Sequence, residues 1–116
     1  MATATAASHS IDLQAQLLHG LSDSSRLRIL AELREDEKRV ADLVRATGLS
    51  QPNASKHLNC LWGCGLVARE KRGREVHYRL IDGVDELLHA VGVVLDQAGE
   101  TIGSCRLTAS TTDRCP

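Results

Sequence analysis

The sequence predicts a mainly helical fold with one small β-hairpin, and three observations support this. Phe is absent, and Trp and Tyr occur once each among the 116 residues, so the core must be built from Leu, Val, Ile and Ala. Apolar residues recur at helical spacing in several segments. Two short strand-like segments flank a basic turn at residues 71–74. A chain of this length is enough for one domain with a modest core.

The first third of the chain contains two segments with helical periodicity. The first, residues 11–21, carries leucines at helical spacing: Leu13, Leu17, Leu18 and Leu21. Ser22 and Asp23 supply a capping signal for a second helix, which fades in the charged run at residues 34–39. Residues 1–10 lack the basic residues and the apolar stretch of a secretory signal, so we expect a flexible N-terminal arm.

The middle of the chain has the pattern of a helix-turn-helix. A short helix around residues 40–44 ends at Gly48, where glycine tolerates the positive φ of a helix terminus. Ser50 is then a suitable N-cap for a helix from about residue 51 to residue 64, which Gly65 terminates. A short helix, a glycine turn and a capped second helix together predict a helix-turn-helix.

The β-hairpin that follows predicts a winged helix-turn-helix. Residues 66–68 and 76–80 are expected to form its strands, directly after the second helix of the motif. Although the net charge is −1, six Lys and Arg stand against two Glu between residues 56 and 79. This basic segment predicts a surface that docks on phosphates.

The N-terminal half of the second motif helix is the part that would enter a major groove. At 100° per residue, Ala54, Leu58 and Leu61 form its inner face. Its outer polar residues are the candidate DNA contacts: Gln51, Asn53, Ser55, Lys56 and His57. Gln and Asn suit adenine edges, Lys suits guanine or phosphate, and Ser suits phosphate. In the wing, Arg72 and Arg74 are expected to hold the DNA backbone.

The last predicted helix, residues 84–98, has a broad apolar stripe that favours a homodimer through the terminal helices. Each such side chain contributes about 1.5–3 kcal/mol when it is buried. A two-fold dimer would match palindromic operator DNA. We therefore expect an arm (1–10), a DNA-binding and dimerisation domain (11–99) and a C-terminal tail (100–116). No segment is long enough to span a membrane, so no membrane partner is expected.

Four cysteines without an export signal predict reduced thiols in the cytoplasm, which act as ligands or redox groups. Cys60 and Cys64 lie one helical turn apart, so they share a face and their thiolates could bind one soft ion. The alternative is a pair of small, semi-buried structural residues. A disulfide within one helix is unfavourable because the Cβ vectors are parallel. No catalytic dyad or phosphate-cradling loop is present, so we expect no enzyme.

The motifs at residues 21–30, 49–58, 65–67 and 72–74 resemble the ArsR/SmtB family, and the resemblance covers residues 13–99. It implies a winged helix-turn-helix repressor. Residues 58–67 resemble the cadmium- and lead-sensing branch of that family. That branch implies two thiolate ligands from this helix and a third from the tail, here Cys105, from the same or the partner subunit. Cys115 has no counterpart, and we assign it no role.

These inferences predict a metal-free homodimer that binds operator DNA and is released when Cd(II) or Pb(II) binds. One ion per thiolate site is expected, held by Cys60, Cys64 and Cys105, without an organic cofactor. Three sulfurs suit Cd(II) and Pb(II) better than Zn(II), which prefers four ligands. A thiol redox-responsive or arsenite-responsive regulator of the same fold is the main alternative. A protein-interaction module without affinity for DNA is another.

Overall fold

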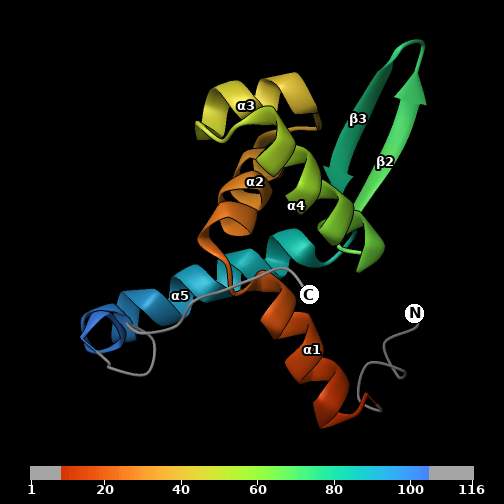
Figure 1. The fold of residues 1–116 in the computed structure, drawn as a ribbon. Helices are drawn as coiled ribbons and strands as arrows, with labels where there is room; N and C mark the ends of the chain where they lie inside the picture. Colours follow the sequence, from red (N-terminus) through yellow and green to blue (C-terminus); the bar gives the residue numbers. More distant parts are fainter. Residues whose placement is uncertain (1–8, 105–116) are drawn as a thin grey trace.

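The computed structural model describes residues 9–104, and in this range the chain forms five helices and three strands (Figure 1). The helices are α1 (Ile11–Leu21), α2 (Ser24–Glu35), α3 (Val40–Thr47), α4 (Gln51–Gly63) and α5 (Val84–Gly103). The strands are β1 (Lys38–Arg39), β2 (Val67–Arg72) and β3 (Glu75–Leu80). Helices α2, α3 and α4 pack together beside the hairpin of β2 and β3, while α1 and α5 extend away from that group (Figure 1). The predicted winged helix-turn-helix is confirmed.

The predicted helix boundaries in the motif are confirmed by the hydrogen bonds at their ends. A side-chain oxygen of Asp23 accepts the N–H of Arg26 at 2.9 Å and so caps α2. The hydroxyl oxygen of Ser50 accepts the N–H of Asn53 at 3.2 Å and caps α4. Gly48, after α3, has a φ of 77°, in the left-handed region that favours glycine. The turn between α3 and α4 is therefore set by local sequence.

The core lies inside the helix-turn-helix, at the meeting point of α2, α3 and α4. Its fully buried side chains are aliphatic, as the composition predicted: Ile29, Leu30, Leu43, Leu58 and Leu61. The hairpin closes this core with Val67 and Tyr78, which are also buried. Arg26 is fully buried as well, and its Nε donates to the carbonyl oxygen of Gly20 at 2.6 Å. This bond ties the start of α2 to the end of α1.

The sheet has three antiparallel strands in the order β1-β3-β2, and only two of them were predicted. The hairpin strands pair from Val67 with Leu80 to Arg72 with Glu75, so they reach further toward the turn than expected. The extra strand, β1, pairs Lys38 with Tyr78. It connects α2 to α3 and lies in the charged run that the sequence left without structure. This pairing attaches the first half of the motif directly to the wing.

Helix α5 is longer than predicted, since it continues through Gly99 to Gly103. The expectation that this helix ends at about residue 98 is wrong. A glycine costs a helix interior only about 0.5–1 kcal/mol relative to alanine, so it does not terminate a helix by itself. Residues 100–103, which we assigned to the tail, are therefore helical. Across the described residues, no helix combines the length and apolar character that crossing a bilayer requires.

Candidate nucleic-acid interface and cysteine site

The N-terminal half of α4 presents the polar row that the sequence predicted for a DNA groove. Gln51, Asn53 and Lys56 are exposed, whereas the inner-face residues Ala54 and Leu58 are fully buried in the core. Ser50 accepts the N–H of Asn53 and residue 52 is a proline without an N–H, so in the first turn of α4 the N–H of Gln51 remains at the positive end of the helix dipole. This end of α4 can therefore present both hydrogen-bonding side chains and a favourable field to a nucleic acid.

Two of the predicted α4 contacts, Ser55 and His57, are half-buried. The His57 side chain is 15% exposed, and its Nδ1 lies 3.8 Å from Oδ2 of Asp23, the residue that caps α2. Nδ1 is buried and has no hydrogen-bond partner. The structure thus places one edge of the His57 ring against the start of α2, and the sequence alone had placed this residue in the outer row with Asn53.

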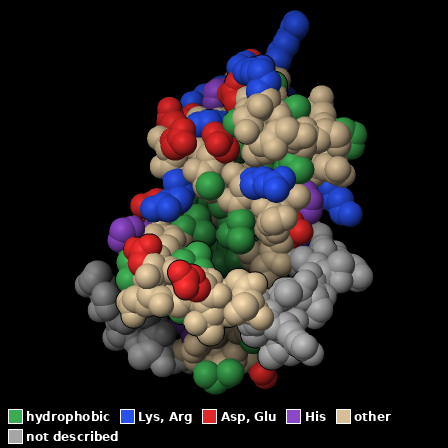
Figure 2. Space-filling view, turned by 90° about the vertical axis from the view of Figure 1, so that its left-hand side faces the viewer, with side chains coloured by type: hydrophobic (Ala, Val, Ile, Leu, Met, Phe, Trp, Pro, Cys, Tyr) green, Lys and Arg blue, Asp and Glu red, His purple; other side chains and the backbone are tan. Residues whose placement is uncertain are grey.

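The two wing arginines that the sequence singled out have different surroundings. Arg74, in the turn, is exposed and has no ion pair among the residues the structure describes. Arg72 instead donates to both carboxylate oxygens of Glu37, with Nη2 at 3.2 Å from Oε2, and to Glu70 at 2.8 Å. Hydrogen bonds to Glu37 and then Glu70 raise the pKa of Arg72, and Arg72 lowers the pKa of Glu70. Figure 2 shows that Lys and Arg side chains gather at the end of the molecule where the wing projects.

A second ion-pair group joins the start of α3 to the wing, and the sequence did not reveal it. Arg39 donates to both carboxylate oxygens of Asp42, at 3.1 and 3.2 Å, and to Glu75 on β3. These bonds raise the pKa of Arg39 and, with the Arg39 backbone N–H, lower the pKa of Asp42 to about 2. The partners lie up to 36 residues apart in the chain, so only the fold brings them together.

The two cysteines of α4 lie one turn apart at its C-terminal end, as predicted. The N–H of Cys64 donates to the carbonyl oxygen of Cys60 at 3.0 Å, and Cys64 is the C-cap residue. Cys60 is half-buried, whereas Cys64 is an exposed free thiol. Within residues 9–104, no three His, Cys, Asp or Glu side chains form a metal-binding group. The third predicted ligand, Cys105, lies outside the described residues.

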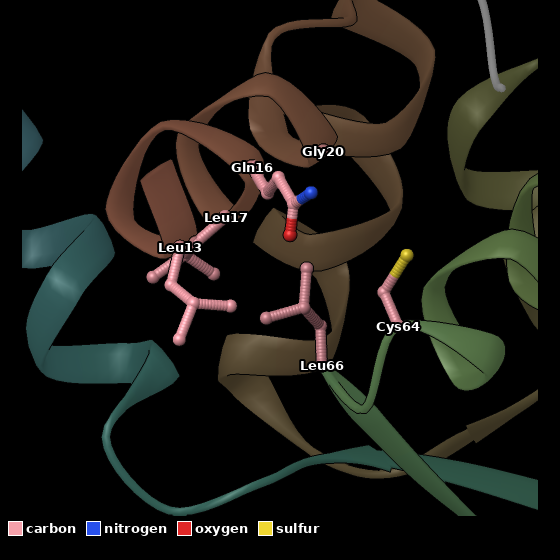
Figure 3. Close-up of a pocket in the computed structure, with 6 residues that line it drawn as sticks. All are labelled: Leu13, Gln16, Leu17, Gly20, Cys64 and Leu66. Carbon is pink, nitrogen blue, oxygen red and sulfur yellow. The ribbon is translucent and has the colours of Figure 1, made fainter. Parts of the chain in front are cut away.

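The thiol of Cys64 borders an apolar pocket of about 310 Å³ between the end of α4 and α1 (Figure 3). The pocket is lined by residues of α1 and of the α4–β2 connection: Leu13, Gln16, Leu17, Gly20, Cys64 and Leu66. In Figure 3, Cys64 faces α1 across this space. A ligand held by Cys64 would therefore lie between the C-terminal end of α4 and α1.

Most apolar side chains of α1 and α5 are exposed, unlike those of the motif. On α1 the exposed group comprises Ile11, Leu13, Leu17 and Leu18. On α5 it comprises Val91, Val93, Val94, Leu95 and Ile102. The buried residues of these helices are confined to Gly20 and Leu21 at the end of α1 and Val84 at the start of α5. An apolar surface of this extent on two neighbouring helices is typical of a protein–protein interface.

Comparison with known proteins agrees with this architecture. The sequence model described as "Bacterial regulatory protein, arsR family" matches residues 23–69, which include α2, α3 and α4. A solved homodimeric winged helix-turn-helix DNA-binding domain from Mycobacterium bovis, described as a possible ArsR-family transcriptional regulator, is 31% identical with a TM-score of 0.66. That likeness covers 82% of this chain and 94% of the other. The chain belongs to the ArsR family.

Two curated transcriptional regulators are also similar to this chain. The HTH-type transcriptional repressor SmtB of Mycobacterium tuberculosis is 40% identical over 90 residues, which are 78% of this chain and 65% of SmtB. The HTH-type transcriptional regulator CmtR of Mycobacterium bovis is 41% identical over 78 residues, which are 67% of this chain and 64% of CmtR. The chain thus spans slightly less than two thirds of each relative. Both relatives are transcriptional regulators, in agreement with the prediction that this ArsR-family chain is not an enzyme.

Proposed function

We propose that this ArsR-family chain is a metal-responsive transcriptional repressor that binds operator DNA as a homodimer. The observation that carries the proposal is the exposed polar row at the start of α4, held on a fully buried aliphatic core and flanked by a basic wing. Gln51, Asn53 and Lys56 would read base edges, with Ser55 and His57 at the margin of the contact. Its similarity to proteins named as transcriptional repressors and regulators supports this function.

The exposed apolar faces of α1 and α5 support a homodimer. A second copy covering Leu17 and Leu18 on α1, and Val94 and Leu95 on α5, would remove them from water. A two-fold arrangement then presents two copies of α4, which would match a palindromic operator with one half-site per protomer. The M. bovis neighbour, described as homodimeric, has the same winged fold.

We further propose that Cys60 and Cys64, with Cys105, hold the inducing metal, Cd(II) or Pb(II), as the family resemblance implies. Thiolates are the ligands that such soft ions prefer, and two of them rise from adjacent turns of α4. A bound soft cation would supply a bridge between the end of α4 and the segment that carries Cys105. Cys60 must be reduced to serve, because a sulfur in a disulfide is not a thiolate ligand. This requirement fits a protein that works in the reducing cytoplasm.

Cys60 and Cys64 lie at the C-terminal end of α4, so a metal bound to them could affect how α4 binds DNA. Cys64 ends the helix whose other end presents Gln51 and Asn53, and it faces α1 across the pocket. A metal bound at this end of α4 would therefore change the orientation of α4 relative to α1 and α5, the helices proposed to form the dimer. A coupling of about 1–3 kcal/mol between two sites is typical of allosteric proteins, and it acts equally on both ligands.

A metal titration of the full-length, reduced protein tests this function. Cd(II) should produce ultraviolet sulfur-to-metal charge-transfer absorption and, at the same stoichiometry, release the protein from a duplex taken from its own promoter region. C60S, C64S and C105S should each bind the duplex but resist release, while C115S serves as the matched control and should respond normally. Release of C60S or C64S at wild-type Cd(II) concentrations would show that the ligand set is wrong. Failure of the reduced protein to bind any duplex would refute DNA binding itself.

A second candidate is a thiol redox-responsive repressor of the same fold, because Cys64 at the end of α4 is an exposed free thiol that an oxidant can reach. Peroxide would oxidise two thiols to a disulfide, with reduction of the peroxide to two waters, and thiol reductant would reverse the change. Because Cys64 is the exposed thiol, C64S should lose the peroxide response. The metal-sensing function instead predicts release by Cd(II) in the presence of thiol reductant and none by peroxide, so these two treatments of the wild-type protein separate the two candidates.

A further inference from the structure

The cations near the tip of the wing are of two kinds, and strand geometry separates them. Side chains alternate between the faces of a strand, and directly paired residues of antiparallel strands share a face. Lys71 therefore lies on the same face as Arg69, Val67 and Tyr78, and Arg72 lies on the opposite face with Glu70. The first face carries the buried Val67 and Tyr78, so it is the one that packs against the helices.

The Lys71 face is also the face on the side of the reading helix. The guanidinium of Arg69 stacks over the Trp62 ring of α4, 3.6 Å from its centroid. Lys71 is two residues further toward the tip, is exposed, and has no ion pair among residues 9–104. Arg74 follows in the turn and is equally exposed and unpaired within that range. Lys71 and Arg74 therefore lie at the end of the wing, and Lys71 is on the face that is directed toward α4.

Arg72 is held on the other face by carboxylates. Glu37 contacts it through both oxygens, and the same Glu37 lies 3.4 Å from Nδ1 of His77 on β3. Glu37 directly precedes β1, so it joins both strands of the hairpin to the segment between α2 and α3. The nearby pair of Arg39 and Glu75 makes a parallel connection from the start of α3. The Arg72 guanidinium already donates four hydrogen bonds to Glu37 and Glu70, so a phosphate would have to compete with these carboxylates for it.

We propose that Lys71 and Arg74 are the wing's phosphate-binding residues, and that Arg72 is a positioning residue through which Glu37 fixes the hairpin beside α4. This inference rests on the proposed binding of DNA and assigns separate roles within that contact. It replaces the sequence-based expectation that Arg72 itself holds the DNA backbone. It also assigns a phosphate contact to Lys71, which was not among the DNA contacts predicted from the sequence. Glu37, an acidic residue beside the proposed DNA-binding surface, acquires a positioning role.

The salt dependence of DNA binding distinguishes the two roles. Each phosphate contact contributes about 0.9 to the slope of log K against log salt concentration on duplex DNA, whatever the sequence. Measured by fluorescence anisotropy with the full-length protein and a labelled duplex of mixed sequence, K71Q and R74Q should each reduce that slope by about this amount per protomer. R72Q, which removes the same charge, should weaken binding several-fold at every salt concentration and leave the slope unchanged.

The carboxylates provide the matched controls. E37Q should weaken binding as R72Q does, and the double variant E37Q/R72Q should be no weaker than R72Q alone, because both changes break one connection. E70Q removes a carboxylate from the same guanidinium, but Glu70 lies on the same strand as Arg72 and connects nothing to the motif. E70Q should therefore bind DNA at least as tightly as the wild type.

Hydrogen exchange in the DNA-free protein supplies a readout that does not depend on DNA binding. R72Q and E37Q should accelerate amide exchange across residues 70–76, while K71Q and R74Q should leave it unchanged. The proposal is overturned if R72Q lowers the salt slope, or if E37Q tightens DNA binding, since either result would mean that Arg72 contacts phosphate. If no duplex is bound but exchange follows this pattern, the proposed function fails while the connection through Glu37 stands.

Discussion

Apolar side chains are buried in one part of the molecule and mostly exposed in the other. In the part from α2 to β3, Ile29 and leucines from three helices are fully buried, and ion pairs on the surface join the segments to one another. In α1 and α5, residues of the same chemistry are exposed, as Leu18 and Val94 are at 54% each. One part forms a complete core within a single chain, whereas the other leaves most of its apolar side chains exposed.

This difference indicates which part of the chain should determine the stability of the protomer and which part should determine its association. The helix-turn-helix and wing depend on contacts within the chain, so changes there should alter the stability of each protomer. The terminal helices depend on whatever covers them, so changes there should alter association first. The pocket between Cys64 and α1 lies where the two parts meet, which is where a sensor would need to act on both.

Leu58→Ala should produce the largest effect, because it opens a cavity in the complete core. Leu58 is fully buried on the inner face of α4, and truncating such a leucine costs about 2–5 kcal/mol. Urea unfolding followed by circular dichroism should show this loss. Leu18→Ala on α1 is the matched control and should cost much less, with any effect growing as the protein is diluted. Equal losses for the two variants would remove the distinction between the two parts.

Val94→Asp should have the next largest effect, on association rather than on folding. If each copy loses about 1.5 kcal/mol of burial, two copies lose about 3 kcal/mol and the dimer dissociation constant rises about 100-fold. Sedimentation analysis should show monomers with an unchanged helical spectrum. Asp96→Asn is the control, since residue 96 lies about 200° from residue 94 around α5. A Val94→Asp protein that sediments as the wild type would show that this face of α5 is not the interface.

Ser50→Ala should have a smaller effect that again differs between the two parts. The Ser50 hydroxyl caps α4 and the Ser10 hydroxyl caps α1 with the same type of hydrogen bond, at 3.2 and 3.1 Å. Loss of such a cap typically costs about 1 kcal/mol. Ser50→Ala should show this cost in urea unfolding and should also weaken DNA binding, because the reading helix frays at its DNA-facing end. Ser10→Ala should leave DNA binding intact, and a loss of affinity in that variant would link α1 to the DNA contact.

The same contrast explains what could be predicted from the sequence. Asp23, Gly48, Ser50 and Gly65 fix helix ends through their own backbone neighbours, so their roles could be recognised locally. The pairing of β1 with β3 and the contact of Glu37 with Arg72 join segments 35 to 40 residues apart, and no local pattern marks them.

Other features were missed because the same residue in the sequence is compatible with two local structures. A glycine near the end of an apolar stripe, such as Gly99, is often a helix terminus. It ends a helix only where the backbone leaves helical geometry, and α5 continues past Gly99. His57 lies in the outer row of α4 by angle alone. Its partial burial follows from the position of Asp23 at the start of α2, which a helical projection of α4 does not contain. The one-turn spacing of Cys60 and Cys64 could be predicted, but the pocket between Cys64 and α1 could not.

The smallest predicted effect concerns acid stability in the helix-turn-helix part, where Arg39 and Asp42 join α3 to the wing. The hydrogen bonds from Arg39 lower the pKa of Asp42 to about 2, below the ordinary value near 3.9 in an unfolded chain. A carboxyl group with a lowered pKa stabilises the fold above the unfolded value and loses that contribution as the pH falls through the folded value. The difference in unfolding free energy between the wild type and Asp42→Asn should therefore be constant near neutral pH and should shrink between about pH 4 and pH 2. In an Arg39→Gln background most of the difference should already be absent at neutral pH, since the main partner of the carboxylate is gone. A difference that persists undiminished to pH 2 would mean that the charge of Asp42 does not stabilise this joint.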